Sequence, residues 1–194
     1  MAKNRLFINA VQEAKRLMSQ AVAIGDVCLD ATCGNGHDTL FLANLVGAQG
    51  KVFAFDVQQM ALDSTQKRLQ LANVAERVSL INDGHQQMAE YVHEKIAGAM
   101  FNLGYLPGGN KGLVTKPNTT VAALDILTEL MLPYGLITLV LYTGHPGGEE
   151  EAKKVTAWAD ALPQDGWDVI SFSFPNRENN SPILLAIQKR GEQC

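Results

Sequence analysis

Cysteine is scarce in this sequence, and the three residues that occur form no C-x-x-C pair. Cys28, Cys33 and Cys194 are odd in number, which argues against both a disulfide framework and a cysteine-rich zinc site. The four histidines are dispersed and include no i, i+4 pair, the spacing that metal-binding helices use. We therefore expect reduced thiols and no bound metal.

Long apolar runs and an excess of positive charge are also missing. No uninterrupted apolar run approaches the roughly 18 to 20 residues that span a bilayer, and residues 1–5 lead into no signal-peptide core. The sequence thus predicts a cytoplasmic protein with no membrane partner. With 16 Lys and Arg against 20 Asp and Glu, the net charge of −4 excludes indiscriminate binding of polyanions, so a nucleic-acid partner would need a local basic patch.

The length fits one domain. A chain of 194 residues, 46% of them hydrophobic, is long enough to bury one core and short for two. We therefore expect a single domain over 1–194. Helical periodicity over 5–22 predicts an amino-terminal helix, within 1–24, packed on that domain.

Apolar runs alternate with helical segments along the rest of the chain. Strands are predicted at 27–30, 51–56, 78–82, 97–103, 135–142, 167–174 and 183–188. Helices are predicted at 40–46, 60–72, 86–95, 119–131 and 149–161. Parallel neighbours need long crossovers, so this alternation predicts an α/β fold with a seven-stranded, mostly parallel sheet and helices on both faces. No helix separates the last two strands, which predicts an antiparallel last strand.

The first predicted strand ends in a polar, glycine-rich turn, Asp30-Ala-Thr-Cys-Gly-Asn-Gly-His-Asp-Thr39. Ligands of open α/β sheets bind beyond the carboxyl ends of the strands. Gly34 and Gly36 permit a tight turn and close approach of a ligand. Asp56, about 20 residues further at the tip of the next strand, is placed to accept hydrogen bonds from two ribose hydroxyls. These features indicate a nucleoside-containing cofactor; a structural turn followed by a solvated Asp56 is the alternative.

The turn itself distinguishes between cofactors. A nicotinamide dinucleotide site uses G-x-G-x-x-G so that pyrophosphate can sit at the helix amino end, but here Asp38 lies near the place of the third glycine. A carboxylate there repels a diphosphate and suits the cationic amino group and sulfonium of S-adenosylmethionine, with Asp30 as a second negative group. The sequence also lacks the G-x-x-x-x-G-K-[ST] pattern of an ATP-binding loop.

Three motifs resemble a known family. They are the turn at 30–39, the block Phe101-Asn-Leu-Gly-Tyr-Leu-Pro-Gly-Gly-Asn-Lys111, and Tyr142-Thr-Gly-His-Pro-Gly-Gly148. Together they resemble the YtqB-like class I methyltransferases, a family labelled rRNA methylases, over essentially the whole chain. The resemblance implies a Rossmann-like class I methyltransferase fold and S-adenosylmethionine as cofactor. Characterised relatives N-methylate 5-aminomethyl-2-thiouridine at the tRNA wobble position to the 5-methylaminomethyl form.

The resemblance also implies roles for the residues at the strand tips. Asn35, Gly36 and Asp38 are expected to line the methionine end of the cofactor, and Asp56 to hold the ribose, with Gln58 just beyond it. Asp83, Gly84 and His85, at the tip of the third strand, are expected to flank the adenine. The commonest turn of class I methyltransferases carries a glycine where Thr32 stands.

The methyl acceptor is expected to meet the tips of the fourth and fifth strands. Amine methylation needs a nitrogen lone pair in line with the sulfonium–methyl bond, and the side-chain oxygen of Asn102 can accept an N–H bond and direct that lone pair. Tyr105 can stack on a pyrimidine. Tyr142 and His145 are close enough in sequence to share a pocket wall, and His145 is a candidate proton acceptor. A helix cap, a packing aromatic and an ordinary surface histidine are the structural alternatives.

The resemblance therefore implies a tRNA-modifying N-methyltransferase, which we expect to bind the anticodon arm. Candidate phosphate contacts are the basic residues Lys3, Arg5, Lys111, Lys116 and Arg177. Two alternatives stay open: a methyltransferase that acts on rRNA or a small amine, and a non-catalytic S-adenosylmethionine-binding partner subunit. Whether the chain forms a homodimer is also open.

Overall fold

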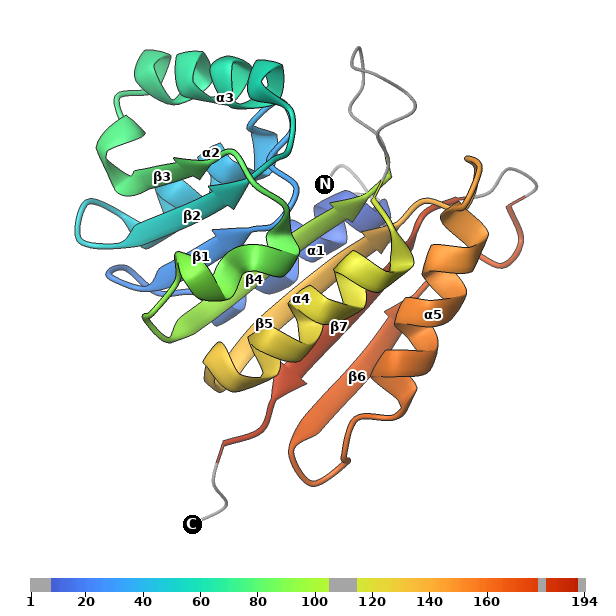
Figure 1. The fold of residues 1–194 in the computed structure, drawn as a ribbon. Coiled ribbons are helices and arrows are strands. Elements are labelled where there is room, and N and C mark those ends of the chain that lie inside the picture. Colours follow the sequence, from blue (N-terminus) through green and yellow to red (C-terminus); the bar gives the residue numbers. More distant parts are fainter. Residues whose placement is uncertain (1–7, 105–114, 178–180, 192–194) are drawn as a thin grey trace, which may run out of the picture.

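A computed structural model describes residues 8–104, 115–177 and 181–191. These residues form a seven-stranded sheet in the order β3-β2-β1-β4-β5-β7-β6 (Figure 1). The strands are β1 (Val27–Asp30), β2 (Lys51–Phe55), β3 (Val78–Ile81), β4 (Ile96–Leu103), β5 (Met131–Leu141), β6 (Trp167–Phe172) and β7 (Ile183–Lys189). β7 is antiparallel to both of its neighbours, β5 and β6, and the other four strand pairs are parallel. The predicted α/β fold with a mostly parallel sheet and an antiparallel last strand is confirmed.

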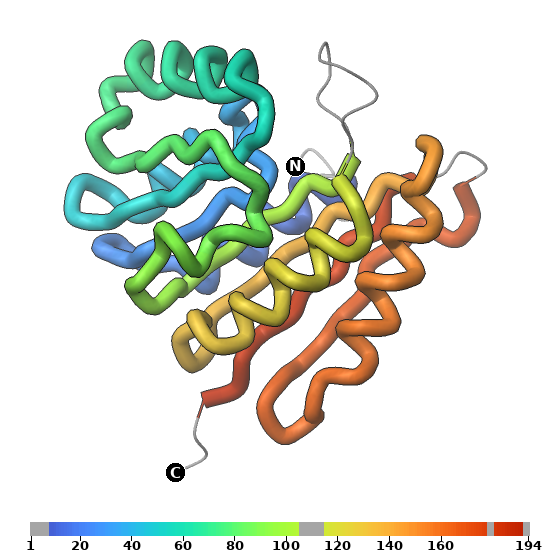
Figure 2. The backbone as a smooth tube through the Cα atoms, viewed as in Figure 1, coloured from blue at the N-terminus to red at the C-terminus, as the bar shows by residue number. Residues whose placement is uncertain are grey.

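Helices cover both faces of the sheet. The helices are α1 (Ala10–Ala21), α2 (His37–Val46), α3 (Gln59–Leu71), α4 (Pro117–Leu130) and α5 (Gly148–Asp160). The first three pack on one face through Met18, Leu42 and Leu69, and α4 and α5 pack on the other through Leu124 and Val155, as Figures 1 and 2 show. No helix of the described residues is long and apolar enough to cross a membrane.

Two predicted helices differ most from the observed ones. The first begins at Ala10 rather than at residue 5, because the Asn9 side chain accepts the backbone N–H of Gln12 and caps the helix there. The predicted helix at 86–95 is a short 3-10 helix, His85–Glu90. Only Met88 and Val92 are buried in the core along this segment, so it lacks the apolar stripe that stabilises a longer helix.

The sheet brings the carboxyl ends of its parallel strands to one edge. Asp30 ends β1 and pairs in register with Met100 of β4 and Ala54 of β2. The strand order runs outward from β1 in one direction and from β4 in the other, so the switch in topology falls between these two strands. Ligands of open α/β sheets bind at such a point.

The packing of α3 yields a matched test of the core. Leu69 is fully buried, whereas Leu71, two residues further, is 87% exposed. We predict that Leu69→Ala lowers the free energy of unfolding by about 2 to 5 kcal/mol because it leaves a cavity, and that Leu71→Ala changes it by less than about 0.5 kcal/mol. Urea denaturation of both variants measures this; equal effects would show that α3 does not pack as described.

Candidate active site

The turn after β1 needs glycine for two reasons. Gly34 and Gly36 both have positive φ, 51° and 76°, a backbone conformation that disfavours other residues. A Cβ on Gly36 would also lie 2.8 Å from Oγ1 of Thr65 in α3. The Thr65 hydroxyl donates to the Gly34 carbonyl at 2.9 Å, so α3 lies directly against the turn and holds its shape.

The tip of β2 is joined to the same turn by Asp56. Its carboxylate accepts the backbone N–H of Gly34 at 3.0 Å on one oxygen and that of Gln58 at 2.9 Å on the other. Partial burial raises the pKa of Asp56, against the effect of these N–H donors. The two features from which the sequence predicted a nucleoside cofactor are therefore in direct contact.

Asp30 lies beneath the turn. The side chain is 1% exposed, and its oxygens accept the backbone N–H of Thr32 at 3.1 Å and the hydroxyl of Thr39 at 2.6 Å. Burial, and secondly the charge of Asp38, raise the pKa of Asp30 to about 7. Asp30 therefore stabilises the turn from beneath through these two hydrogen bonds and does not face a ligand.

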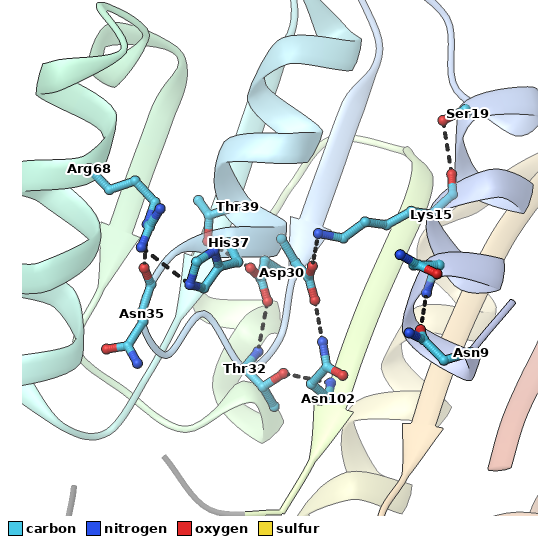
Figure 3. Close-up of polar contacts among 12 residues, drawn as sticks. Asn9, Lys15, Ser19, Asp30, Thr32, Asn35, His37, Thr39, Arg68 and Asn102 are labelled. Carbon is cyan, nitrogen blue, oxygen red and sulfur yellow. Dashed lines mark hydrogen bonds and ion pairs between the residues drawn. The ribbon is translucent and has the colours of Figure 1, made fainter. Parts of the chain in front are cut away.

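Asp38 joins two elements that are far apart in the sequence. One oxygen is 2.7 Å from Nζ of Lys15 in α1, and the other accepts a hydrogen bond from the side-chain amide of Asn102 in β4. The backbone N–H of Asn102 donates to Oγ1 of Thr32 at 2.8 Å, which gives a function to the residue that stands in place of the usual glycine. Figure 3 shows Lys15 and Asn102 converging on the turn.

Asn102 has one polar atom left over. Its Oδ1 is buried, and no donor among the described residues reaches it. Because the amide nitrogen is bound to Asp38, the orientation of the amide is fixed and Oδ1 points elsewhere. A buried acceptor without a hydrogen bond costs free energy, so Oδ1 of Asn102 indicates a place where an N–H or O–H donor of a ligand can bind.

Arg68 of α3 approaches the turn from the side opposite Lys15 (Figure 3). Its Nε donates to the Asn35 carbonyl at 2.7 Å, and its terminal nitrogen lies 3.2 Å from Nε2 of His37. Burial, followed by the charges of Arg68 and Lys15, lowers the pKa of His37. The sequence analysis did not predict Arg68 or Lys15 as site residues, because each lies within an ordinary amphipathic helix with no motif around it.

The tip of β3 carries the half-buried Asp83 and the buried His85. Asp83 accepts the backbone N–H of Gly84 at 2.7 Å and the hydroxyl of Tyr91 at 2.9 Å. His85 is 7% exposed, and its Nδ1 donates to the Ala31 carbonyl at 3.0 Å. Burial lowers the pKa of His85. His85 thus supports the turn from below, whereas Asp83 and Gly84 stay at the edge where the sequence places the adenine.

The tips of β4 and β5 lie side by side. A Cβ on Gly104 would lie 3.6 Å from Nε2 of His145 and 3.9 Å from Cβ of Tyr142, so these predicted residues do share one wall. Nδ1 of His145 is 3.1 Å from the Pro146 carbonyl. Burial, and secondly the charge of Asp38, raise the pKa of Tyr142. Tyr105 lies outside the described residues.

This arrangement defines the class of protein. A glycine turn tied to an acid at the next strand tip is a nucleoside-binding site at a topological switch. A carboxylate beside the place of the third glycine is unsuited to the pyrophosphate of a dinucleotide. Together with the fixed polar acceptor at the tip of β4, it fits a class I methyltransferase. No group of three His, Cys, Asp or Glu in the described ranges is placed to hold a metal ion.

Comparisons with known proteins identify the family. The family model described as "Putative rRNA methylase" matches residues 52–188, and that of the ubiE/COQ5 methyltransferase family matches residues 7–96. A chloroplastic tRNA (mnm(5)s(2)U34)-methyltransferase of Arabidopsis thaliana is 41% identical over 191 residues, 93% of this chain and 69% of the relative. The chain therefore belongs to the rRNA methylase family of the first model, as its motifs predicted.

Solved structures agree with this assignment. A "putative rRNA-methylase" from Clostridium thermocellum is 42% identical with a TM-score of 0.93, and the match covers 95% of this chain and 100% of that one. A methyltransferase from Streptococcus mutans in complex with SAH is 35% identical with a TM-score of 0.88, covering 95% and 99%. The protein is an S-adenosylmethionine-dependent methyltransferase, and the Gly34–Gly36 turn, Asp56 and Asp38 fit that cofactor.

The buried Asp30 makes stability depend on pH. Its pKa is higher in the folded protein than in the unfolded chain, so the folded state holds the proton between about pH 4 and 7. The free energy of unfolding should therefore fall as pH rises through this window, by at most about 1.4 kcal/mol per pH unit. In Asp30→Asn the contribution of Asp30 to this fall should be absent, so the fall should be smaller than in the wild-type protein. Urea denaturation between pH 5 and 8 tests this; parallel profiles for the two proteins would contradict it.

Proposed function

We propose that this protein transfers the methyl group of S-adenosylmethionine to the amine of 5-aminomethyl-2-thiouridine at the tRNA wobble position. The product is the 5-methylaminomethyl nucleoside. The observation that carries the proposal is the buried, unpaired Oδ1 of Asn102, held in a fixed orientation at the tip of β4. The name of the Arabidopsis relative, 41% identical, supports the same substrate.

The cofactor-binding residues follow from the geometry of the turn. In our proposal Gly34, Asn35, Gly36 and Asp38 surround the methionine end, and Asp56 and Gln58 accept the ribose. Asp83 and Gly84 border the adenine, while His85 supports the turn by its hydrogen bond to the Ala31 carbonyl. When bound, S-adenosylmethionine supplies an electrophilic methyl group on a sulfonium.

Catalysis then consists of aligning one amine. The neutral amine donates an N–H to Oδ1 of Asn102, which directs its lone pair along the methyl–sulfur axis. The N–C bond forms as the C–S bond breaks, S-adenosylhomocysteine leaves, and the new secondary ammonium loses a proton. His145, beside Gly104, is the proposed acceptor of that proton, and Tyr142 closes the same wall. No metal is required, since the sulfonium is already an activated leaving group.

The tRNA contact is proposed to involve the anticodon arm. Lys116 precedes α4, and the backbone N–H of the preceding residue, Thr115, donates to the carbonyl of Gly104 just after β4 at 3.0 Å. Arg177 lies after β6, with its guanidinium 3.6 Å from the centre of the Phe174 ring. Both can contact phosphate, although the net charge of the chain is negative. A cytoplasmic location and a homodimer remain predictions, the latter tested by light scattering of the purified protein.

The substrate is tested by mass spectrometry of digested nucleosides. We expect the purified protein to convert 5-aminomethyl-2-thiouridine in tRNA that lacks the terminal methyl, when labelled S-adenosylmethionine is supplied. Matched reactions contain rRNA or the free nucleoside in place of tRNA. Label in rRNA alone would instead establish the rRNA alternative. Tight cofactor binding with no transfer to any acceptor would favour a non-catalytic partner subunit.

Two substitutions separate cofactor binding from transfer. Asp56→Ala should weaken S-adenosylmethionine binding by about 10- to 100-fold, because it removes a charged hydrogen-bond acceptor. Asn102→Ala should change binding by less than about 3-fold, since Lys15 still holds Asp38, yet lower kcat by about 100-fold through loss of alignment. Calorimetry and single-turnover assays measure these values. Asp63→Ala, an exposed acid of α3, is the control; the reverse pattern would overturn the assigned roles.

A further inference from the structure

The methionine end of S-adenosylmethionine carries two opposite charges, an ammonium and a carboxylate. Asp38 offers a partner for the ammonium alone. A carboxylate bound beside the acidic residues Asp38 and Asp56 would be repelled unless a cation lay within reach. The proposed role of Asp38 therefore requires a basic group on the same side of the turn.

Lys15 is that group. Its Nζ is 2.7 Å from Oδ1 of Asp38, and its side chain remains 28% exposed, so the ammonium can contact a ligand without leaving Asp38. We infer that Lys15 binds the carboxylate of the cofactor, and that Lys15 and Asp38 together recognise the amino-acid end as a zwitterion. This inference rests on the proposed role of Asp38 and not on the identity of the RNA.

The position of Lys15 is fixed by the packing of α1. Met18, one turn further along the helix, is fully buried, and a Cβ on Gly98 of β4 would lie 2.5 Å from its Sδ. The Lys15 ammonium also lies 5.2 Å from the centre of the Phe41 ring in α2. The side chain is therefore directed toward the turn from a helix that packs closely on the sheet, as Figure 3 shows.

Other cations of the described residues are less suited to this task. Arg68 also reaches the turn, but its guanidinium is engaged by the Asn35 carbonyl and by His37. Of the ion pairs in the described part of the chain, only that of Lys15 includes a carboxylate of the turn. Lys15 is thus the basic residue with both the contact and the exposure that the carboxylate needs.

The inference is tested with two ligands that differ only in the carboxylate. S-adenosylhomocysteine has it, and S-adenosyl-3-thiopropylamine lacks it while keeping the amine. We expect the wild-type protein to bind the first about 10-fold or more tightly than the second, as a charge-assisted contact provides. Lys15→Met should lose that preference, with weaker binding of S-adenosylhomocysteine and less than about 2-fold change for the thiopropylamine, measured by calorimetry.

Control variants distinguish this from a structural role. Arg16→Met removes a neighbouring charge that pairs with Glu13 instead, and should leave both affinities unchanged. Lys15→Arg should keep the preference, and Asp38→Asn should weaken both ligands because both carry the amine. An equal loss for both ligands in Lys15→Met, or a gain, would overturn the inference. Lys15→Gln replaces Lys15→Met if thermal unfolding shows the latter to be misfolded.

None of these measurements involves RNA. A protein that fails to methylate tRNA but shows the ligand pattern would overturn the proposed substrate and leave the role of Lys15 intact. A protein that methylates tRNA but binds both ligands equally would overturn the role of Lys15 and leave the proposed substrate intact.

Discussion

The carboxylate of Asp38 holds the site together. Asp38 lies in the first turn of α2, and its oxygens bind Lys15 of α1 and Asn102 of β4, so three elements from distant parts of the chain meet on one carboxylate. A charged acceptor with two charge-compatible donors is a strong and directional contact at low exposure. The same carboxylate also positions two groups of the proposed site, because it fixes the orientation of the Asn102 amide and the location of the Lys15 ammonium.

The acidic character of the site and a nucleic-acid substrate are compatible in this protein. The acids lie at and beneath the turn, where they are neutralised by Lys15, by backbone N–H groups or by burial. A phosphate backbone senses charges within about a Debye length, roughly 10 Å in ordinary buffers. A local group of basic side chains can therefore contact RNA although the net charge is negative, and Lys116 and Arg177 are the proposed members of such a group.

The sequence predicted most of the architecture because alternating apolar runs and glycine turns are local signals. It also located Asp56, Asn102, Tyr142 and His145 at neighbouring strand tips, as parallel strands require. It did not predict how Asp30 and His85 turn inward, because burial depends on the layer beneath. Lys15 and Thr32 were missed as site residues, since their partners are 23 and 70 residues away and no periodicity encodes such a pairing.

The insertion of β7 between β5 and β6 has a consequence for synthesis. β6 lies at the edge of the sheet and pairs with β7 alone among the described strands, although it precedes β7 in the chain. While a ribosome is still making β7, neither β6 nor the open side of β5 has its neighbour, and both expose backbone groups that favour association with other chains. The half of the sheet built from β1 to β4 needs no strand that is made later, so the cofactor turn can form before the sheet is complete.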